Sequence, residues 1–235
     1  MNLKGSKVLI TGSSDGIGYA TAALAKERGA QVFLNGRNEE KLERAMKQLS
    51  APGLAADVGE RSEAQAMVAA AREAMGGIDV VVNNAGWGKR MTIEEYDPEV
   101  ALAIWQTNIL GVVHTTQAAL DDLKSAKGAI VNIASTAALR GYPGGSAYCA
   151  SKFALRGMTE CWRAELRPHD IRVLLVNPSE VQTSFFGGDP DRELNPKKLY
   201  SEDIAHAICG ALEMDDRGFI PELSVFATNP FPAQS

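Results

Sequence analysis

Cysteine and histidine are scarce in this chain of 235 residues. The three cysteines, Cys149, Cys161 and Cys209, are odd in number and widely spaced, and there are three histidines. Neither set has the spacing of a disulfide framework or of a zinc site. We therefore expect reduced thiols and no metal centre.

Long hydrophobic runs and blocks of like charge are also absent. No apolar stretch approaches the roughly 18–20 residues that cross a bilayer. The apolar run near the N-terminus is too short for a signal peptide and has no small-residue cleavage site after it. The formal net charge of -5 argues against general binding to phosphate backbones. We expect a cytoplasmic protein that binds neither nucleic acid nor membrane.

What the chain does contain is a regular alternation of short β-branched, apolar segments with segments of helical periodicity. Strands are expected at 7–11, 31–35, 53–57, 78–82, 128–134, 171–176 and 223–227, and helices at 17–28, 39–49, 61–75, 98–123, 148–166 and 202–213. Continuous apolar strands indicate burial on both faces. The alternation predicts an α/β fold, a doubly wound parallel sheet of the Rossmann type with helices on both faces. No linker or repeat marks a boundary, so we expect a single domain.

A glycine-rich turn joins the first expected strand to the first expected helix. It reads Thr11-Gly12-Ser13-Ser14-Asp15-Gly16-Ile17-Gly18, with the spacing Gly-x-x-x-Gly-x-Gly. Glycines let the backbone turn tightly and approach a ligand, and a helix N-terminus offers N–H groups to a pyrophosphate. The turn predicts a dinucleotide site, against the alternative of a βα turn with no ligand.

The end of the second expected strand reads Asn35-Gly36-Arg37-Asn38. NAD enzymes usually place an acidic residue there for the ribose, whereas NADP enzymes place an arginine nearby. Arg37 offers a fork of donors to a 2′-phosphate, and Ser13 or Ser14 adds a hydroxyl. Asp15 would oppose the phosphate if it pointed inward. We expect NADP(H) rather than NAD(H).

Tyr148 and Lys152 lie one helical turn apart, so they project from the same helix face. A phenol with an ordinary pKa near 10 is a poor proton exchanger at neutral pH. An adjacent ammonium favours the phenolate, so we expect Lys152 to lower the pKa of Tyr148.

Several motifs together resemble the short-chain dehydrogenase/reductase family, in its compact single-domain branch. They are the glycine-rich turn, Asn83-Asn84-Ala85-Gly86 and Tyr148-Cys149-Ala150-Ser151-Lys152, with Ser135 thirteen residues before Tyr148 and Asn108 in the long helix. The resemblance covers about residues 3 to 183. It is closest, loosely, to 3-oxoacyl-carrier-protein reductases and general ketoreductases.

The resemblance implies a catalytic tetrad of Asn108, Ser135, Tyr148 and Lys152. Tyr148 would be the general acid and base in hydride transfer between NADP(H) and a carbonyl or alcohol. Ser135 would bond the substrate oxygen, Lys152 would also hold the nicotinamide ribose, and Asn108 would hold a relay water. The cofactor contacts implied are Gly12, Ser13, Ser14, Asp15, Gly16, Ile17, Gly18, Arg37, Asp57, Val58, Asn83, Ala85, Gly86, Tyr148, Lys152, Pro178, Ser179, Val181 and Thr183. Ser179 departs from the glycine most often found in the family, which affects the fine shape of the pocket.

The substrate side is expected to be apolar and aromatic, covered by a lid loop at 183–200. Its expected lining is Trp87, Ser135, Ala137, Arg140, Tyr142, Tyr148, Phe185 and Phe186. Arg140 is a candidate anion anchor, and the rest fits a ketone or aldehyde with an apolar body. Apolar residues on several sides of helices 98–123 and 148–166, with the family's habit, predict a homodimer or homotetramer.

Two other function classes stay open. A lyase or epimerase can use the same tyrosine–lysine pair, but such enzymes usually carry a larger C-terminal domain, and only about 50 residues follow Thr183. A non-catalytic redox sensor or scaffold would bind NADP(H) without needing Ser135, Tyr148 and Lys152, and all three are present.

Overall fold

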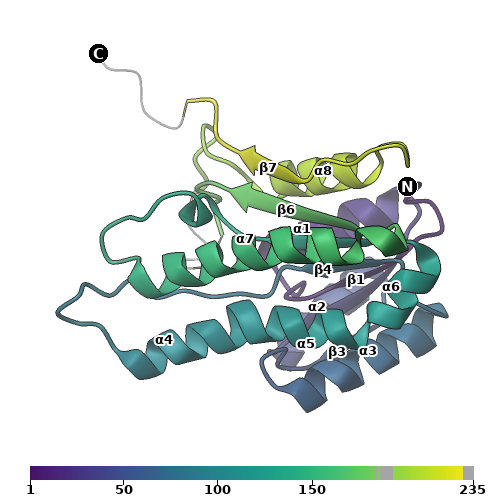
Figure 1. Ribbon diagram of the computed structural model, residues 1–235, viewed down its shortest axis with the longest axis horizontal. Coiled ribbons are helices and arrows are strands. Elements are labelled where there is room, and N and C mark those ends of the chain that lie inside the picture. The colour runs from purple at the N-terminus through teal and green to yellow at the C-terminus, as the bar shows by residue number, and fades with distance from the viewer. Residues whose placement is uncertain (184, 186–192, 230–235) are drawn as a thin grey trace.

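A parallel sheet forms the centre of the molecule (Figure 1). The computed structural model describes residues 1–183, 185 and 193–229. The strands are β1 (Lys7–Ile10), β2 (Gln31–Gly36), β3 (Gly53–Ala55), β4 (Val80–Asn83), β5 (Ala129–Ile133), β6 (Arg172–Pro178) and β7 (Glu222–Val225). Their order is β3-β2-β1-β4-β5-β6-β7, and every neighbouring pair is parallel. The α/β fold that the sequence predicts is confirmed.

The central strands are buried on both faces because their sequences are apolar throughout. Every residue of β4, β5 and β6 is buried. Val8 of β1 is in register with Val32 of β2 on one side and with Val80 of β4 on the other. The chain therefore leaves β1 toward β2 and later returns to β4, which makes the β1/β4 boundary the topological switch point of the sheet.

Helices cover both faces of this sheet (Figure 1). On one face, α1 (Gly16–Glu27), α2 (Glu39–Leu49) and α8 (Ser201–Leu212) bury Ala22, Leu42 and Ile204 in one cluster. On the other, α3 (Arg61–Met75), α6 (Leu120–Ala126) and α7 (Ser146–Leu166) bury Met67, Leu123 and Leu166 in a second cluster. The core is thus two apolar layers on either side of the strands.

The long helix expected at 98–123 is interrupted. It consists of α4 (Pro98–Trp105), a π turn η1 (Gln106–Leu110), α5 (Gly111–Ala118) and α6. The Gly111 N–H bonds to the carbonyl of Gln106, five residues back. A Cβ on Gly111 would lie 2.6 Å from Val58 Cγ2, so the helix needs a glycine at this close approach. No proline or other sequence signal marks this interruption, and π turns concentrate at functional sites.

The remaining differences are at element ends. Helix α7 begins two residues before the expected 148, and β7 begins one residue before 223. Two short 3-10 turns, η2 (Thr136–Ala138) and η3 (Arg167–His169), flank α7 in the chain. Phe186 and the middle of the expected 183–200 lid, at 184 and 186–192, lie outside the described residues. No helix among the described residues is long and apolar enough to span a bilayer.

Candidate active site

A cavity of about 1190 Å³ opens at the carboxyl ends of the strands, where the loops after β1, β2, β4, β5 and β6 meet. In open α/β sheets this edge is where ligands bind. The sequence-predicted residues that line it are Gly12, Ser14, Asp15, Gly16, Ile17, Arg37, Val58, Ala85, Gly86, Ser135, Tyr148, Lys152, Pro178, Ser179, Val181 and Thr183. One cavity therefore joins the glycine-rich turn to the tyrosine–lysine pair.

The glycine-rich turn is held by the loop after β4. Gly12 has φ +63°, and a Cβ there would lie 2.8 Å from Ala85 Cα. The Asn84 side-chain amide donates to the carbonyls of Thr11 and Gly12 at 2.9 and 2.8 Å. The Thr11 hydroxyl in turn accepts from the N–H groups of Asn84 and Ala85 at 3.0 Å each. Asn84 is thus a structural part of the site. Its place between Asn83 and Ala85, two expected cofactor contacts, could have identified it from the sequence.

Five predicted residues do not line the cavity: Ser13, Gly18, Asp57, Asn83 and Asn108. The Ser13 hydroxyl donates to the Ile10 carbonyl and accepts from the Asn35 N–H. The buried Asn83 amide donates to Thr116 and Asn132 at 3.1 and 2.9 Å. These two side chains fix the ends of β1 and β4. Neither side chain faces the cavity.

Two ion pairs occupy the rim where the second strand ends. Arg37 lies 3.4 Å from Asp57, and Lys41 lies 3.0 Å from Asp15. All four side chains are about half-exposed, so neither pair contributes much stability. The charge of Asp15 is balanced by Lys41, which the sequence reasoning missed. The position of Lys41, four residues after Arg37 and in the first turn of α2, could have identified it from the sequence.

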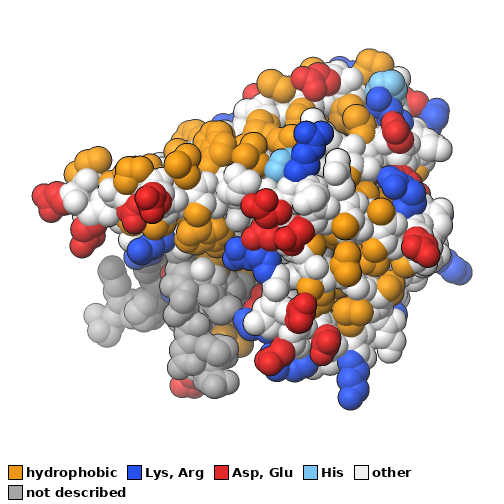
Figure 2. Space-filling model, turned by 90° about the horizontal axis from the view of Figure 1, so that it is seen from below, with side chains coloured by type: hydrophobic (Ala, Val, Ile, Leu, Met, Phe, Trp, Pro, Cys, Tyr) orange, Lys and Arg blue, Asp and Glu red, His pale blue; other side chains and the backbone are white. Residues whose placement is uncertain are grey.

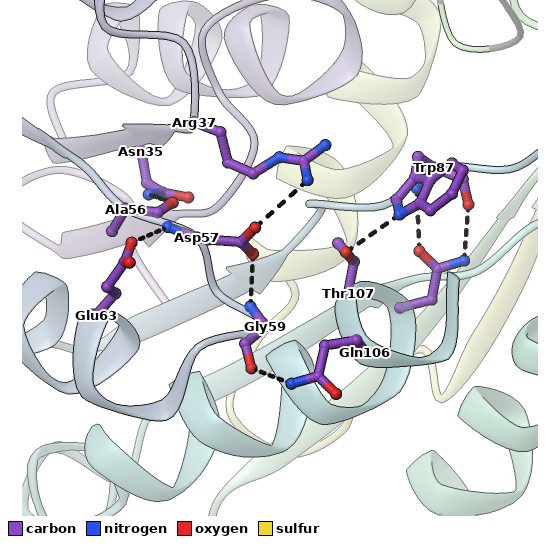
Figure 3. A network of polar contacts seen from close by, with 10 residues as sticks. Asn35, Arg37, Ala56, Asp57, Gly59, Glu63, Trp87, Gln106 and Thr107 are labelled. Carbon is purple, nitrogen blue, oxygen red and sulfur yellow. Dashed lines mark hydrogen bonds and ion pairs between the residues drawn. The ribbon is translucent and has the colours of Figure 1, made fainter. Parts of the chain in front are cut away.

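A chain of polar contacts runs from this rim toward the π turn (Figure 3). Asp57 accepts a hydrogen bond from the Gly59 N–H at 2.9 Å, and the Gln106 amide donates to the Gly59 carbonyl at 2.6 Å. The next residue, Thr107, accepts from the Trp87 indole at 3.2 Å. The loops after β3 and β4 are therefore both tied to η1. Trp87 does not line the cavity, contrary to expectation, because its ring packs near Met91 and Ile104.

Asn108 lies in the π turn and is fully buried. Its side-chain oxygen accepts from the Trp87 N–H, and its amide donates to the Trp87 carbonyl and to Ser151 in α7, all at 3.0 Å. A Cβ on Gly86 would lie 3.1 Å from Asn108 Oδ1 and 3.6 Å from Lys152 Nζ. The narrow space at Gly86 therefore brings the π turn next to the lysine.

Lys152 is buried and its ammonium donates to the Ile133 carbonyl at 2.8 Å. Burial lowers the pKa of Lys152 to about 8. Burial raises the pKa of Tyr148, and a hydrogen bond with Ser135 only partly opposes that rise. The net direction is therefore a raised pKa of Tyr148, where a lowering was expected, because burial outweighs the favourable contacts. The ammonium lies 5.7 Å from the ring centroid and is turned toward a carbonyl.

The other end of the cavity is aromatic. The Phe185 ring meets the Tyr148 ring edge-on, with centroids 5.6 Å apart. The Arg90 guanidinium lies 5.8 Å from the centroid of Tyr142. Ala137 and Arg140 line this end as the sequence predicts, and Arg90 was missed because nothing in its local sequence distinguishes it from the neighbouring Lys89.

The parallel sheet, the glycine-rich turn at its switch point and the tyrosine–lysine pair in one cavity define a Rossmann-type oxidoreductase site. The chain belongs to the short-chain dehydrogenase family, whose model matches residues 6–193. The family resemblance found in the sequence is confirmed, and the protein is an oxidoreductase of this family.

Known proteins cover almost the whole chain. It is 33% identical over 224 residues to an uncharacterised oxidoreductase of Staphylococcus aureus (strain USA300), with 92% of this chain and 95% of that one aligned. An alcohol dehydrogenase from Thermococcus sibiricus, solved with 5-hydroxy-NADP, is 29% identical with a TM-score of 0.87 and covers 97% and 99%. A 3-ketoacyl-(acyl-carrier-protein) reductase from Brucella melitensis, solved with NADH, is 29% identical with a TM-score of 0.88 and covers 97% and 100%.

Proposed function

We propose that this protein transfers a hydride between NADP(H) and a carbonyl or secondary alcohol, with Tyr148 as general acid and base. The observation that carries the proposal is the shared cavity, in which Tyr148, Ser135 and Lys152 lie at one end and the glycine-rich turn at the other. The tetrad roles of Asn108, Ser135, Tyr148 and Lys152 belong to this proposal.

The residues present fit a dinucleotide. Gly12 and Gly16 have positive φ angles, and a Cβ on Gly16 would reach Thr183 at 3.6 Å on the other side of the cavity. Asp15 precedes α1 without capping it through its side chain, which suits a phosphate at the first N–H groups. Arg37 and Lys41 supply cations where a 2′-phosphate needs them. The solved relatives that carry NADP and NADH support the same cofactor class.

When bound, the cofactor supplies the hydride that adds to the carbonyl carbon and is itself oxidised. Tyr148 donates the proton to the carbonyl oxygen, and its raised pKa keeps that proton in place at neutral pH. Ser135 donates a hydrogen bond where negative charge develops on the same oxygen. After the transfer, the Lys152 ammonium stabilises the phenolate.

Proton return through Asn108 has a constraint. Its amide donates both N–H groups, one to Trp87 and one to Ser151. A relay water at Asn108 must therefore be held by an oxygen atom of this residue, because neither N–H group of its amide is left to donate to the water.

The two rival classes are separated by one experiment. Loss of NADPH absorbance is measured against a panel of ketones and aldehydes, with NADPH binding measured separately. The wild type is expected to oxidise NADPH, and Tyr148→Phe is expected to lose about a hundredfold to ten-thousandfold in kcat while binding NADPH within about twofold. Tyr19→Phe, which removes a phenolic hydroxyl outside the cavity, is the matched control and stays within a few-fold.

Binding without turnover would identify a sensor or scaffold. Conversion with no net loss of NADPH would identify the lyase or epimerase class. Equal activity of the wild type and Tyr148→Phe would remove the tyrosine from the mechanism.

Assembly as a homodimer or homotetramer is part of the proposal. Leu102 and Trp105 of α4 and Phe153 of α7 are exposed, and these two helices pack side by side. Figure 2 shows hydrophobic side chains gathered on the part of this face that carries α4. Such a patch is typical of a subunit interface.

A further inference from the structure

Helix α7 carries Tyr148 and Lys152 in its first two turns, so the position of its start decides where the phenol and the ammonium lie. Gly145 stands at its N-cap and has no side chain with which to bond the free N–H groups of the first turn. Contacts with neighbouring elements therefore have to hold this end of the helix. Helix α4 and the π turn η1 both pack against α7.

Ser151 lies between the tyrosine and the lysine in the sequence and is fully buried. Its hydroxyl donates to the Tyr148 carbonyl at 2.7 Å and accepts from the side-chain amide of Asn108, in η1, at 3.0 Å. A hydroxyl has a single hydrogen to donate, so its use on Tyr148 leaves only lone pairs toward Asn108. One side chain thus joins the turn of α7 that carries the phenol to the π turn.

The same contact fixes the orientation of the Asn108 amide, which has no exposed surface. The amide oxygen accepts from the Trp87 N–H, and one amide N–H donates to the Trp87 carbonyl. The other N–H donates to Ser151. If the oxygen and nitrogen were exchanged, N–H groups would face each other at Trp87 and an oxygen would face the lone pairs of Ser151. Only the observed orientation therefore satisfies all three contacts.

The oxygen of this amide and the ammonium of Lys152 adjoin the same space, beside Gly86. A Cβ on Gly86 would lie 3.1 Å from Asn108 Oδ1 and 3.6 Å from Lys152 Nζ. The observed orientation thus places the negative end of the amide dipole on the side of the buried ammonium. Loss of the Ser151 hydroxyl would leave one buried N–H of Asn108 without a bond, and this would favour any other orientation in which that N–H finds a partner.

We propose that Ser151 is a positioning residue of the catalytic site, whose hydroxyl sets the orientation of the Asn108 amide and fastens the turn of α7 that carries Tyr148 to the π turn. This inference rests on the proposed reductase function. Ser151 does not line the cavity, so it acts on the reaction only through the residues that it holds.

Thr159 provides a matched control, because it makes the same pair of bonds two turns further along α7. It is buried, donates to the Leu155 carbonyl at 2.7 Å and accepts from the Asn132 side-chain amide at 2.9 Å. Ser151→Ala and Thr159→Val therefore remove equivalent contacts between a hydroxyl and an amide. Both variants are expected to lower Tm by a few degrees.

The kinetic test uses NADPH oxidation with the ketone or aldehyde that the wild type reduces fastest. Ser151→Ala is expected to lower kcat about tenfold and to change the dissociation constant of NADPH by less than about twofold, because it displaces groups at the reacting end only. Thr159→Val is expected to stay within about twofold in both quantities. Ser151→Cys keeps a side chain of similar size with a weaker acceptor, and it takes the place of Ser151→Ala if the alanine variant does not fold.

A double-mutant cycle tests whether the effect passes through Asn108. In an Asn108→Ala background, Ser151→Ala is expected to change kcat by less than about twofold, because the partner of the hydroxyl is already gone. Hydrogen exchange of the Asn108 side-chain amide gives a second measurement that needs no turnover. Its ¹⁵N NMR signals are those absent from Asn108→Ala, and their exchange is expected to be about tenfold faster in Ser151→Ala and unchanged in Thr159→Val.

The outcomes distinguish this inference from the function on which it rests. If Ser151→Ala and Thr159→Val lower kcat equally, or if the loss persists in Asn108→Ala, Ser151 supports only the fold, and the positioning role is wrong while the reductase stands. If the wild type reduces no carbonyl compound, the proposed function fails and the catalytic consequence of Ser151 fails with it. Unchanged exchange of the amide in Ser151→Ala would then refute the hold on Asn108 as well.

Discussion

The two ends of the cavity are built in different ways. The glycine-rich end, proposed to hold the cofactor, consists of strand termini and glycine backbone, locked by Asn84 and Thr11 through four hydrogen bonds. The aromatic end, proposed to hold the substrate, consists of loop side chains that pack against the start of α7, as Arg90 packs against Tyr142. The fold itself therefore specifies the first end, whereas a few exchangeable side chains specify the second. Such a division allows one scaffold to accept many substrates.

Lys152 is expected both to assist Tyr148 and to hold the nicotinamide ribose, so replacing it should have the largest effect. Lys152→Met is expected to lower kcat by at least about a hundredfold, because the phenolate loses its nearest cation. The same change should raise the dissociation constant of NADPH, because the ribose loses a donor. Steady-state rates and fluorescence titration with NADPH check both. A variant that loses turnover but binds NADPH normally would show that Lys152 acts in the reaction and does not contribute to NADPH binding.

The same variant is expected to be more stable than the wild type near neutral pH. The lowering of the Lys152 pKa from 10.5 to about 8 corresponds to a burial cost of about 3 kcal/mol, offset by roughly 1 kcal/mol for the hydrogen bond to Ile133. Below pH 8 both the folded and the unfolded state are protonated, so the wild type bears the full cost. Between about pH 8 and 10.5 the folded state releases its proton first, so the advantage of methionine disappears.

Urea unfolding at pH 7 and at pH 9.5 measures this difference. We expect Lys152→Met to gain about 2 kcal/mol at pH 7 and clearly less at pH 9.5. Higher pH is avoided, since the raised pKa of Tyr148 destabilises the folded state above pH 10. Lys47→Met on the exposed side of α2 is the control and should show no such pH dependence. A gain in the free energy of unfolding that is the same at both pH values would contradict the claim that Lys152 is a buried ammonium at neutral pH.

A smaller effect is expected at the rim of the cofactor end. Arg37→Ala should weaken NADPH binding by about tenfold and NADH binding by less than about twofold, because only NADPH carries the 2′-phosphate. Competition titrations of both cofactors measure the ratio. The control is Arg44→Ala, an exposed arginine on α2 that does not line the cavity. Equal losses for both cofactors would show that the rim does not discriminate between them.

The sequence predicted most of the residues that line the cavity, at its aromatic end as well as at its glycine-rich end. The sequence features that allowed this prediction are glycines, short motifs and buried strands, which can be recognised from neighbouring residues at fixed spacings. The π turn at Gln106–Leu110 was missed because no local signal marks it, and the close approach of Gly111 to Val58 joins segments that are distant in sequence. Lys41 was missed because its partner, Asp15, lies across the cavity rim.

The pKa values were missed for a related reason. Helical spacing places Lys152 beside Tyr148 but says nothing about where its ammonium points. In the structure the ammonium bonds to the Ile133 carbonyl of β5, and burial dominates the pKa of both groups. The place of Arg90 in the cavity could not be predicted either, because Arg90 packs on Tyr142, which is 52 residues away in the chain.

A crystal structure of the protein with NADP⁺ tests the central claim most directly. We expect the pyrophosphate at the glycine-rich turn, the 2′-phosphate beside Arg37 and Lys41, and the nicotinamide ring within reach of the Tyr148 hydroxyl. A dinucleotide bound with its nicotinamide away from Tyr148, or outside this cavity, would contradict the assignment of the protein as a reductase.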